Sequence, residues 1–211
     1  MPKLIIPGLR LPETVKVGIW EMGESEEKLY AENPVLQQFQ EQVSCLKSSV
    51  RRLEYLSVRY IMFNMLGEIK EVFHNSDGKP YLLEGPNISI SHTKGYATVA
   101  LSENLNVAID MEYRSERVCR IAPRFLRDDE APTSTEGKLL CWCAKETLYK
   151  LHSSDKLTFH EMRISSLPEK DGLQSGKIIA ENLRRNVAVE VSFVTTRDFV
   201  LTYAFENGEK M

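Results

Sequence analysis

The first part of the chain passes from alternating to helical spacing of its hydrophobic residues. Apolar residues alternate in "VKVGIWEM", residues 15–22, which predicts a strand. Asn33-Pro34 then opens a helical stretch through "VLQQFQEQVSCL". A longer helix is predicted from Ser49 to a stop at Gly67. The apolar face expected for this helix holds Leu53, Leu56, Tyr60 and Phe63.

The next stretch, residues 71–113, consists of short β-branched runs and predicts a meander of strands. Turns are expected at Asp77-Gly78, Gly85-Pro86, Lys94-Gly95 and Glu103-Asn104. Helical spacing returns after Arg114, and Thr133-x-x-Glu136 has the form of a capping box for the helix "KLLCWCAKETLYKL", residues 138–151. Further strands are predicted in "LTFHEMRIS", "KIIAE", "VAVEVSF" and "FVLTYAF", with a charged, glycine-containing loop near 168–176.

The order of these elements is strand, helices, strands, and then helices, strands. It predicts an α+β fold built as a pseudo-twofold duplication of two similar α/β half-domains, residues 1–104 and 105–211. The length of 211 residues suits two such halves. The duplication is inferred from element order alone, because no repeat is visible residue by residue.

Composition excludes several classes of protein. Hydrophobic residues make up 42% of the chain and charged residues 27%, as in ordinary globular domains. No apolar run is long enough to span a bilayer, and the N-terminal apolar stretch is broken by Pro7 and Pro12 and lacks the features of a signal peptide. We therefore expect a cytoplasmic protein with no membrane partner. A net charge of −3 argues against nucleic acid as a partner.

Cys141 and Cys143 flank Trp142 and raise the question of a metal site. One residue between the two cysteines is fewer than zinc sites generally use, and neither a second cysteine pair nor a nearby His-x-x-x-His completes a set of four ligands. Without a secretion signal, reduced thiols are expected. We interpret both cysteines as packing positions.

Asp110 and Glu112 lie in the apolar strand "AIDMEY" at positions i and i+2. Alternate strand residues share a face, so the two carboxylates project together. A hard divalent cation such as magnesium would relieve their repulsion, and manganese accepts the same ligands. Taken alone, an edge strand that presents two acids to solvent is the commoner arrangement.

Four other residues have both a structural and a functional interpretation. The i, i+4 spacing of Glu146 and Lys150 is that of a surface ion pair. His92, between Ser91 and Thr93, is compatible with a structural histidine or with a phosphate site. Lys79 sits in the tight turn "DGKPY", where a solvated lysine is usual.

The order of motifs is more specific than any one of them. "GKP", "ISISH", "IDMEY", "FLRDDE" and "WCAKETLYK" follow one another as in the 4'-phosphopantetheinyl transferase family. The chain resembles the larger, monomeric (Sfp) type of that family. The motifs run from about Gly78 to Lys150, and length and element order extend the resemblance over nearly the whole chain.

The resemblance implies a cleft between two α/β halves that binds coenzyme A as co-substrate. It implies transfer of the 4'-phosphopantetheine arm to a serine of an apo acyl or peptidyl carrier protein, with release of 3',5'-ADP. By position, Asp110, Glu112 and Glu146 would hold Mg²⁺, with Mn²⁺ as an alternative. Glu146, directly or through a metal-bound water, would also be the base for the carrier serine.

The resemblance assigns further residues to coenzyme A. Lys150 would contact its phosphates near the point of attack, and with Glu146 and His92 it completes the set of catalytic candidates. Lys79, Ser91 and His92 match positions that grip coenzyme A, including its 3'-phosphate. Arg51 or Arg52 could add to this grip, and an ion pair with Glu54 on a surface helix is an equal alternative. Lys145 lies in another direction on its helix, so its role stays open.

Two departures from the family pattern bear on efficiency rather than on reaction class. Ala108 stands where the family usually has glycine, and "FLRDDE" replaces Phe-Ser-x-x-Glu, with Glu130 kept as an acid outside the ligand set. The run Arg114, Arg117, Arg120, Arg124 and Arg127 follows the metal strand, and we expect some of these arginines to steer an acidic carrier.

Two other functions remain open at this stage: a coenzyme A-binding regulatory homologue without transfer activity, and an α+β interaction protein with coincidental motifs. One active site needs no second chain in the two-half architecture, so we expect a monomer.

Overall fold

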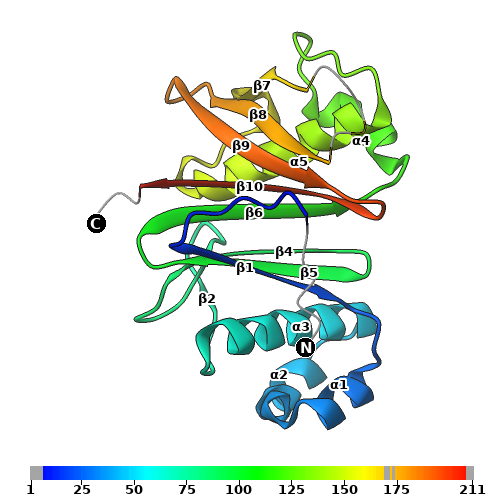
Figure 1. Cartoon of the computed structure of the whole chain (residues 1–211), viewed down its shortest axis with the longest axis vertical. Helices are drawn as coiled ribbons and strands as arrows, with labels where there is room; N and C mark the ends of the chain where they lie inside the picture. The colour runs from blue at the N-terminus through cyan, green and yellow to red at the C-terminus, as the bar shows by residue number, and fades with distance from the viewer. Residues whose placement is uncertain (1–6, 169–171, 173, 208–211) are drawn as a thin grey trace.

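The computed structural model describes residues 7–168, 172 and 174–207. Its first sheet has three antiparallel strands in the order β1 (Val15–Glu21), β5 (Tyr96–Ser102) and β4 (Asn87–Thr93). The helical segments α1 (Glu26–Glu32), η1 (Pro34–Phe39), α2 (Gln40–Ser44) and α3 (Ser49–Leu66) lie below this sheet in Figure 1. Leu56 and Ile61 of α3 are buried with Val99 of β5, which joins the helices to the sheet.

A short hairpin of β2 (Phe73–His74) and β3 (Pro80–Tyr81) projects beside the first sheet (Figure 1). The Asn75 side-chain carbonyl accepts hydrogen bonds from the backbone N–H groups of Asp77 and Lys79, and Gly78 has a φ of 80°. This left-handed conformation favours glycine. The turn predicted at Asp77-Gly78 is confirmed, and it places Lys79 at the start of the returning strand.

The second sheet has five antiparallel strands in the order β6 (Leu105–Tyr113), β10 (Phe199–Asn207), β9 (Val187–Thr195), β8 (Ser175–Asn182) and β7 (Met162–Ser166). One face is covered by α4 (Arg117–Phe125) and α5 (Thr135–Leu151) (Figure 1). Two short 3-10 segments, η2 (Ser153–Asp155) and η3 (Phe159–Glu161), connect α5 to β7. Cys141 and Cys143 are fully buried in this core, which confirms that they are packing positions.

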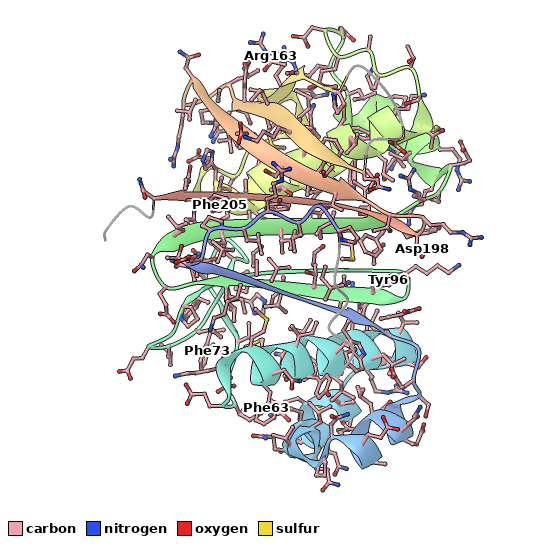
Figure 2. All side chains as sticks on the ribbon, viewed as in Figure 1. Phe63, Phe73, Tyr96, Arg163, Asp198 and Phe205 are labelled. Carbon is pink, nitrogen blue, oxygen red and sulfur yellow. The ribbon has the colours of Figure 1, made fainter. Side chains whose placement is uncertain are left out.

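The two sheets meet where β4 lies beside β6. Hydroxyl groups on β4 accept hydrogen bonds from backbone N–H groups of β6: Ser89 from Ile109, Ser91 from Met111 and Thr93 from Tyr113. Behind this line an apolar layer joins β1 and β5 to β6 and β10. At one edge of the layer, Tyr96 donates to Asp198 over 3.4 Å, and these residues lie side by side in Figure 2.

The structure confirms the α+β class, and the change of sheet falls between Ser102 and Leu105. The duplication is not confirmed and stays a prediction, because the two sheets differ in strand number and order. Across the described ranges, no helix is long and apolar enough to cross a membrane.

Several local predictions need correction. The cap of α5 is Ser134 rather than Thr133, since the Ser134 hydroxyl accepts the Gly137 N–H. The predicted strand "LTFHEMRIS" begins as the 3-10 segment η3, which a Thr158–Glu161 capping box fixes, and only then becomes β7. The helix α1 was not predicted, although Ser25 caps it. The loop predicted near 168–176 lies in part outside the described residues, and β8 begins at Ser175.

Candidate functional site

A cleft of about 430 Å³ opens between α3, the β2–β3 hairpin, β4 and the C-terminal half of α5, and we call it the main cleft. It therefore draws residues from both sides of the junction between the sheets. The charged side chains and histidines that line it are Arg51, Arg59, Lys79, Lys150, His74, His92, Glu54, Asp77 and Glu146. Cationic side chains thus come from α3, the hairpin and α5, and each of these segments also contributes one acid. Such a combination suits a polyanionic ligand.

Asp110 is buried on β6 at the back of this region. Its Oδ1 accepts a hydrogen bond from the Ser91 hydroxyl over 2.9 Å and pairs with the Lys150 ammonium at 2.8 Å. Its Oδ2 is buried and has no hydrogen-bond partner among the residues that the structure describes. A carboxylate oxygen without a partner is costly inside a protein, so this atom is available to a ligand or cation.

Glu112 follows two residues later and is also held by neighbours. The Trp142 indole N–H donates to its Oε1 over 3.0 Å, and the Thr93 hydroxyl lies 3.4 Å from its Oε2. Burial raises the pKa of Glu112, and the negative charge of Asp110 raises it further. Asp110 and Glu112 contact alternate residues of β4, Ser91 and Thr93, so both carboxylates project toward the same strand.

Glu146 projects into the main cleft from α5. Burial raises the pKa of this carboxyl to about 7, with a further contribution from Asp110 that Lys150 opposes. The three carboxylates influence one another electrostatically, yet no metal-binding group of three such side chains is already assembled within the described part of the chain. Their negative charge is therefore only partly compensated by protein groups.

Lys150 lies one helical turn beyond Glu146 and bridges the two sheets. Its ammonium donates to the backbone carbonyls of Ile90 on β4 and Ile109 on β6, besides its ion pair with Asp110. The expected i, i+4 ion pair with Glu146 does not appear in the described residues. Lys150 is thus placed next to the carboxylates and beside the main cleft.

His92 lies at the other side of the main cleft between two charged residues of α3. Its Nδ1 is 3.3 Å from Glu54, and its Nε2 is 3.2 Å from the Arg51 guanidinium. Burial lowers the pKa of His92; the Glu54 carboxylate acts against this, whereas Arg51 adds to the lowering. Arg51 also forms the predicted ion pair with Glu54, at 3.0 Å, while it lines the cleft.

Two pairs of adjacent residues that the sequence analysis assigned together to coenzyme A have different surroundings in the structure. They are Ser91 with His92 and Arg51 with Arg52. Ser91 is not among the residues that line the main cleft, and its hydroxyl is engaged with β6, whereas neighbouring His92 lines the cleft. Arg52 binds Glu26 and the carbonyls of Leu46 and Lys47, so it connects α3 to the preceding helices.

Lys79 does line the cleft, and its ammonium donates to Asn106 over 2.6 Å. Burial lowers the pKa of Lys79, and the charge of Glu206 opposes this. This lysine is therefore not the freely solvated turn residue that its position in "DGKPY" allowed.

Arg59 is a cleft residue that sequence reasoning missed. Its guanidinium stacks 3.6 Å from the centre of the Tyr55 ring, and burial lowers its pKa. Arg51, Tyr55 and Arg59 are each four residues apart on α3, a spacing that places them along one stripe of the helix. That spacing was the available signal.

Lys145 has a structural contact set. Its buried ammonium pairs with Glu130 at 2.7 Å and donates to the carbonyl of Phe125. Glu130 also accepts the backbone N–H groups of Arg127 and Ile164. The pair ties α5 to the segment after α4, and within the described residues no hydrogen bond or ion pair joins Glu130 to Asp110, Glu112 or Glu146.

A second cavity of about 360 Å³ lies between α4 and α5. Glu112 and Trp142 form its inner wall, and Arg117 and Arg124 of α4 lie at its border. Arg114 is occupied elsewhere, by Glu136 and by the carbonyl of Thr196. Arg117 and Arg124 are thus the members of the arginine run that border this cavity.

No protein-family model matches the chain, and a search of curated proteins likewise finds no match.

Proposed function

We propose that the protein is a 4'-phosphopantetheinyl transferase that uses coenzyme A and an apo carrier protein. The observation that carries this proposal is the convergence of Lys79, His92, Glu146 and Lys150 on one cleft, with the buried Asp110 carboxylate in contact with Lys150. Cations on the cleft walls suit the phosphates of coenzyme A. The motif order of the sequence supports the same assignment, and two of the acids line cavities, Glu146 the main cleft and Glu112 a second one.

The residues at the carboxylate cluster fit a divalent cation. Asp110 offers a buried oxygen that has no hydrogen-bond partner among the described residues, and burial, followed by the negative charge of Asp110, raises the pKa values of Glu112 and Glu146. Asp110, Glu112 and Glu146 would hold Mg²⁺ or Mn²⁺. When bound, the ion would neutralise charge that develops on the pyrophosphate.

The chain's own residues would then have distinct tasks. Arg51, Arg59, Lys79 and His92 would bind phosphates along the main cleft. Glu146 would accept the proton of the carrier serine, because it is a carboxylate that lines the cleft. The serine oxygen would bond to the β-phosphorus of coenzyme A, and the bond from that phosphorus to the bridging oxygen would break, releasing 3',5'-ADP. Lys150 would stabilise the charge on the departing phosphate.

A mass measurement tests this function. The protein is mixed with coenzyme A, magnesium and an apo carrier, and the carrier is expected to gain the mass of one phosphopantetheine. EDTA should abolish the gain, and Glu146→Gln should lower the rate about 100-fold or more. A carrier that keeps its mass while coenzyme A binds would overturn the transferase assignment.

A second function is favoured by one observation, the ion pair of Lys150 with Asp110 at 2.8 Å. This pair compensates part of the carboxylate charge without a metal, as a coenzyme A-binding regulatory homologue would need. The same mixture distinguishes the two functions: binding of coenzyme A without a mass change supports the regulatory homologue. If coenzyme A does not bind at all, the result supports the third interpretation, an α+β interaction protein.

A further inference from the structure

Asn106, the second residue of β6, lies behind the main cleft and contacts three separate parts of the chain. Its side-chain carbonyl accepts the Lys79 ammonium at 2.6 Å, and its amide nitrogen donates to the carbonyl of Leu151 over 2.9 Å. The same nitrogen lies 3.5 Å from a carboxylate oxygen of Glu206. Since the donor lies on one side and both acceptors on the other, the orientation of the amide is defined.

Neighbouring groups hold Asn106 in turn. Glu206 is its direct partner in the β6–β10 pairing, so their side chains share one face of the sheet. The other carboxylate oxygen of Glu206 is 3.2 Å from Nε2 of His152, which caps the end of α5. Leu151 is the last residue of α5, and its carbonyl has no partner within the helix. Asn106 therefore joins the hairpin of Lys79 to the end of the helix that carries Glu146 and Lys150.

The partner of Lys79 is an amide rather than a carboxylate. In the described ranges no acid lies within ion-pairing distance of its ammonium, and the nearest charge that affects it is that of Glu206, behind Asn106. A carboxylate in place of the amide would neutralise the ammonium. The neutral amide fixes its position and leaves its positive charge for an anion in the main cleft.

We propose that Asn106, supported by Glu206 and the Leu151 carbonyl, is a positioning residue that holds Lys79 for a phosphate of the cleft ligand. The inference rests on the proposed function for the ligand, coenzyme A. Asn106 lies outside the residues that the motifs assign to coenzyme A. Its proposed role also explains why the hairpin and the end of α5 are joined through its side chain.

Binding of coenzyme A to four variants tests the proposal. Asn106→Ala and Lys79→Ala are each expected to raise the Kd about tenfold, because each removes one charge-assisted contact. In the Lys79→Ala background, Asn106→Ala should add no further loss. Asn87→Ala is the matched control, since its amide donates to the carbonyl of Leu105 nearby but does not contact Lys79. Additive losses, or an unchanged Kd in Asn106→Ala, would overturn the positioning role.

A second measurement needs no ligand. The chain is acetylated with a limiting reagent, and labelling of Lys79 is followed by peptide mass spectrometry against exposed Lys177 as reference. Asn106→Ala should speed Lys79 labelling several-fold, and Asn87→Ala should leave it unchanged. Equal labelling in Asn106→Ala and wild type would overturn the proposal.

If Asn106→Ala does not fold, as judged by circular dichroism, Asn106→Ser gives the same test, because its hydroxyl is too short to reach Lys79. Wild-type protein that binds no coenzyme A would refute the proposed function. The labelling result would still decide whether Asn106 positions Lys79.

Discussion

Glu146 combines a half-buried position with neighbours of like charge. Burial and Asp110 raise its pKa to about 7, so at neutral pH a substantial fraction of this carboxyl is protonated unless a cation is present. The residue is thereby both a base matched to neutral pH and a source of instability when it is charged. The raised pKa and the destabilising effect of the charged form have the same cause. The carboxylate is shielded from water and lies near another negative charge.

Stability against pH should reveal this carboxyl. A folded pKa of about 7 lies above the ordinary value of 4.5, so the contribution of Glu146 is fully present below about pH 4.5 and is lost as pH rises through about 7. Between pH 5 and pH 8, metal-free wild type should lose about 2 to 3 kcal/mol of unfolding free energy relative to Glu146→Gln. Urea unfolding in EDTA measures the difference. Parallel pH curves for the two proteins would contradict the assigned pKa.

At this scale, sequence reasoning predicted the direction of some side chains correctly and of others wrongly. The i, i+2 spacing of Asp110 and Glu112 correctly indicated a shared face. Ser91 and His92, however, were grouped as neighbours, although adjacent strand residues point to opposite faces. Arg51 and Arg52 diverge for the same reason, because consecutive helix residues lie about 100° apart.

At the scale of elements, the contact between β4 and β6 depends on hydroxyl side chains. Ser89, Ser91 and Thr93 each accept a backbone N–H of β6, and Ser91 also donates to Asp110. Strand β4 thereby supplies hydrogen-bond acceptors to backbone N–H groups at the edge of the second sheet, and it orients the carboxylate of Asp110. No hydrophobic pattern signals this contact, since serine and threonine at alternate positions also suit a solvated strand face.

Removal of one hydroxyl should therefore destabilise the protein out of proportion to its size. Ser91→Ala leaves the buried Met111 N–H without its acceptor and takes a donor from Asp110. We expect a loss of about 1 to 3 kcal/mol in unfolding free energy, measured by urea titration. Ser165→Ala is the matched control, because that exposed hydroxyl contacts the Glu181 carboxylate and the carbonyl of Ile179 and is not the acceptor of a buried backbone N–H. Equal stability of the two variants would refute a structural role for the Ser91 hydroxyl.

Element type was largely predictable, and the failures have local causes. Periodicity and the stop at Gly67 correctly predicted α3, whose last residue is Leu66. The missed helix α1 spans seven residues, and Leu29 is its buried residue. Such a short segment is not long enough to show the helical spacing of apolar residues. At η3, apolar residues resembled a strand, but the Thr158–Glu161 cap bends the chain before β7 begins. Local side-chain hydrogen bonds, rather than the spacing of apolar residues, determine the backbone conformation of η3.

At the scale of the whole molecule, two cavities on different surfaces each reach one of the carboxylates, Glu146 in the main cleft and Glu112 in the second cavity. The main cleft presents cations from α3 and the hairpin, whereas the second cavity is bordered by Arg117 and Arg124 of α4. Under the proposed function, coenzyme A would occupy the first, and the serine of an acidic carrier would approach through the second. Arg114 is unsuited to this task because Glu136 already pairs with it.

Charge reversal on α4 should then separate the two substrates. The double variant Arg117→Glu, Arg124→Glu is expected to lower carrier loading at limiting carrier about tenfold or more, because it replaces attraction by repulsion at an approach surface. Its affinity for coenzyme A should stay unchanged, since neither arginine lines the main cleft. Arg120→Glu is the matched control on the same helix, because Arg120 is exposed but does not border the second cavity. The effect should also shrink as salt rises, as expected for interactions between exposed charges. If the double variant loses coenzyme A binding in parallel, or if Arg120→Glu is equally impaired, the carrier does not approach through the second cavity.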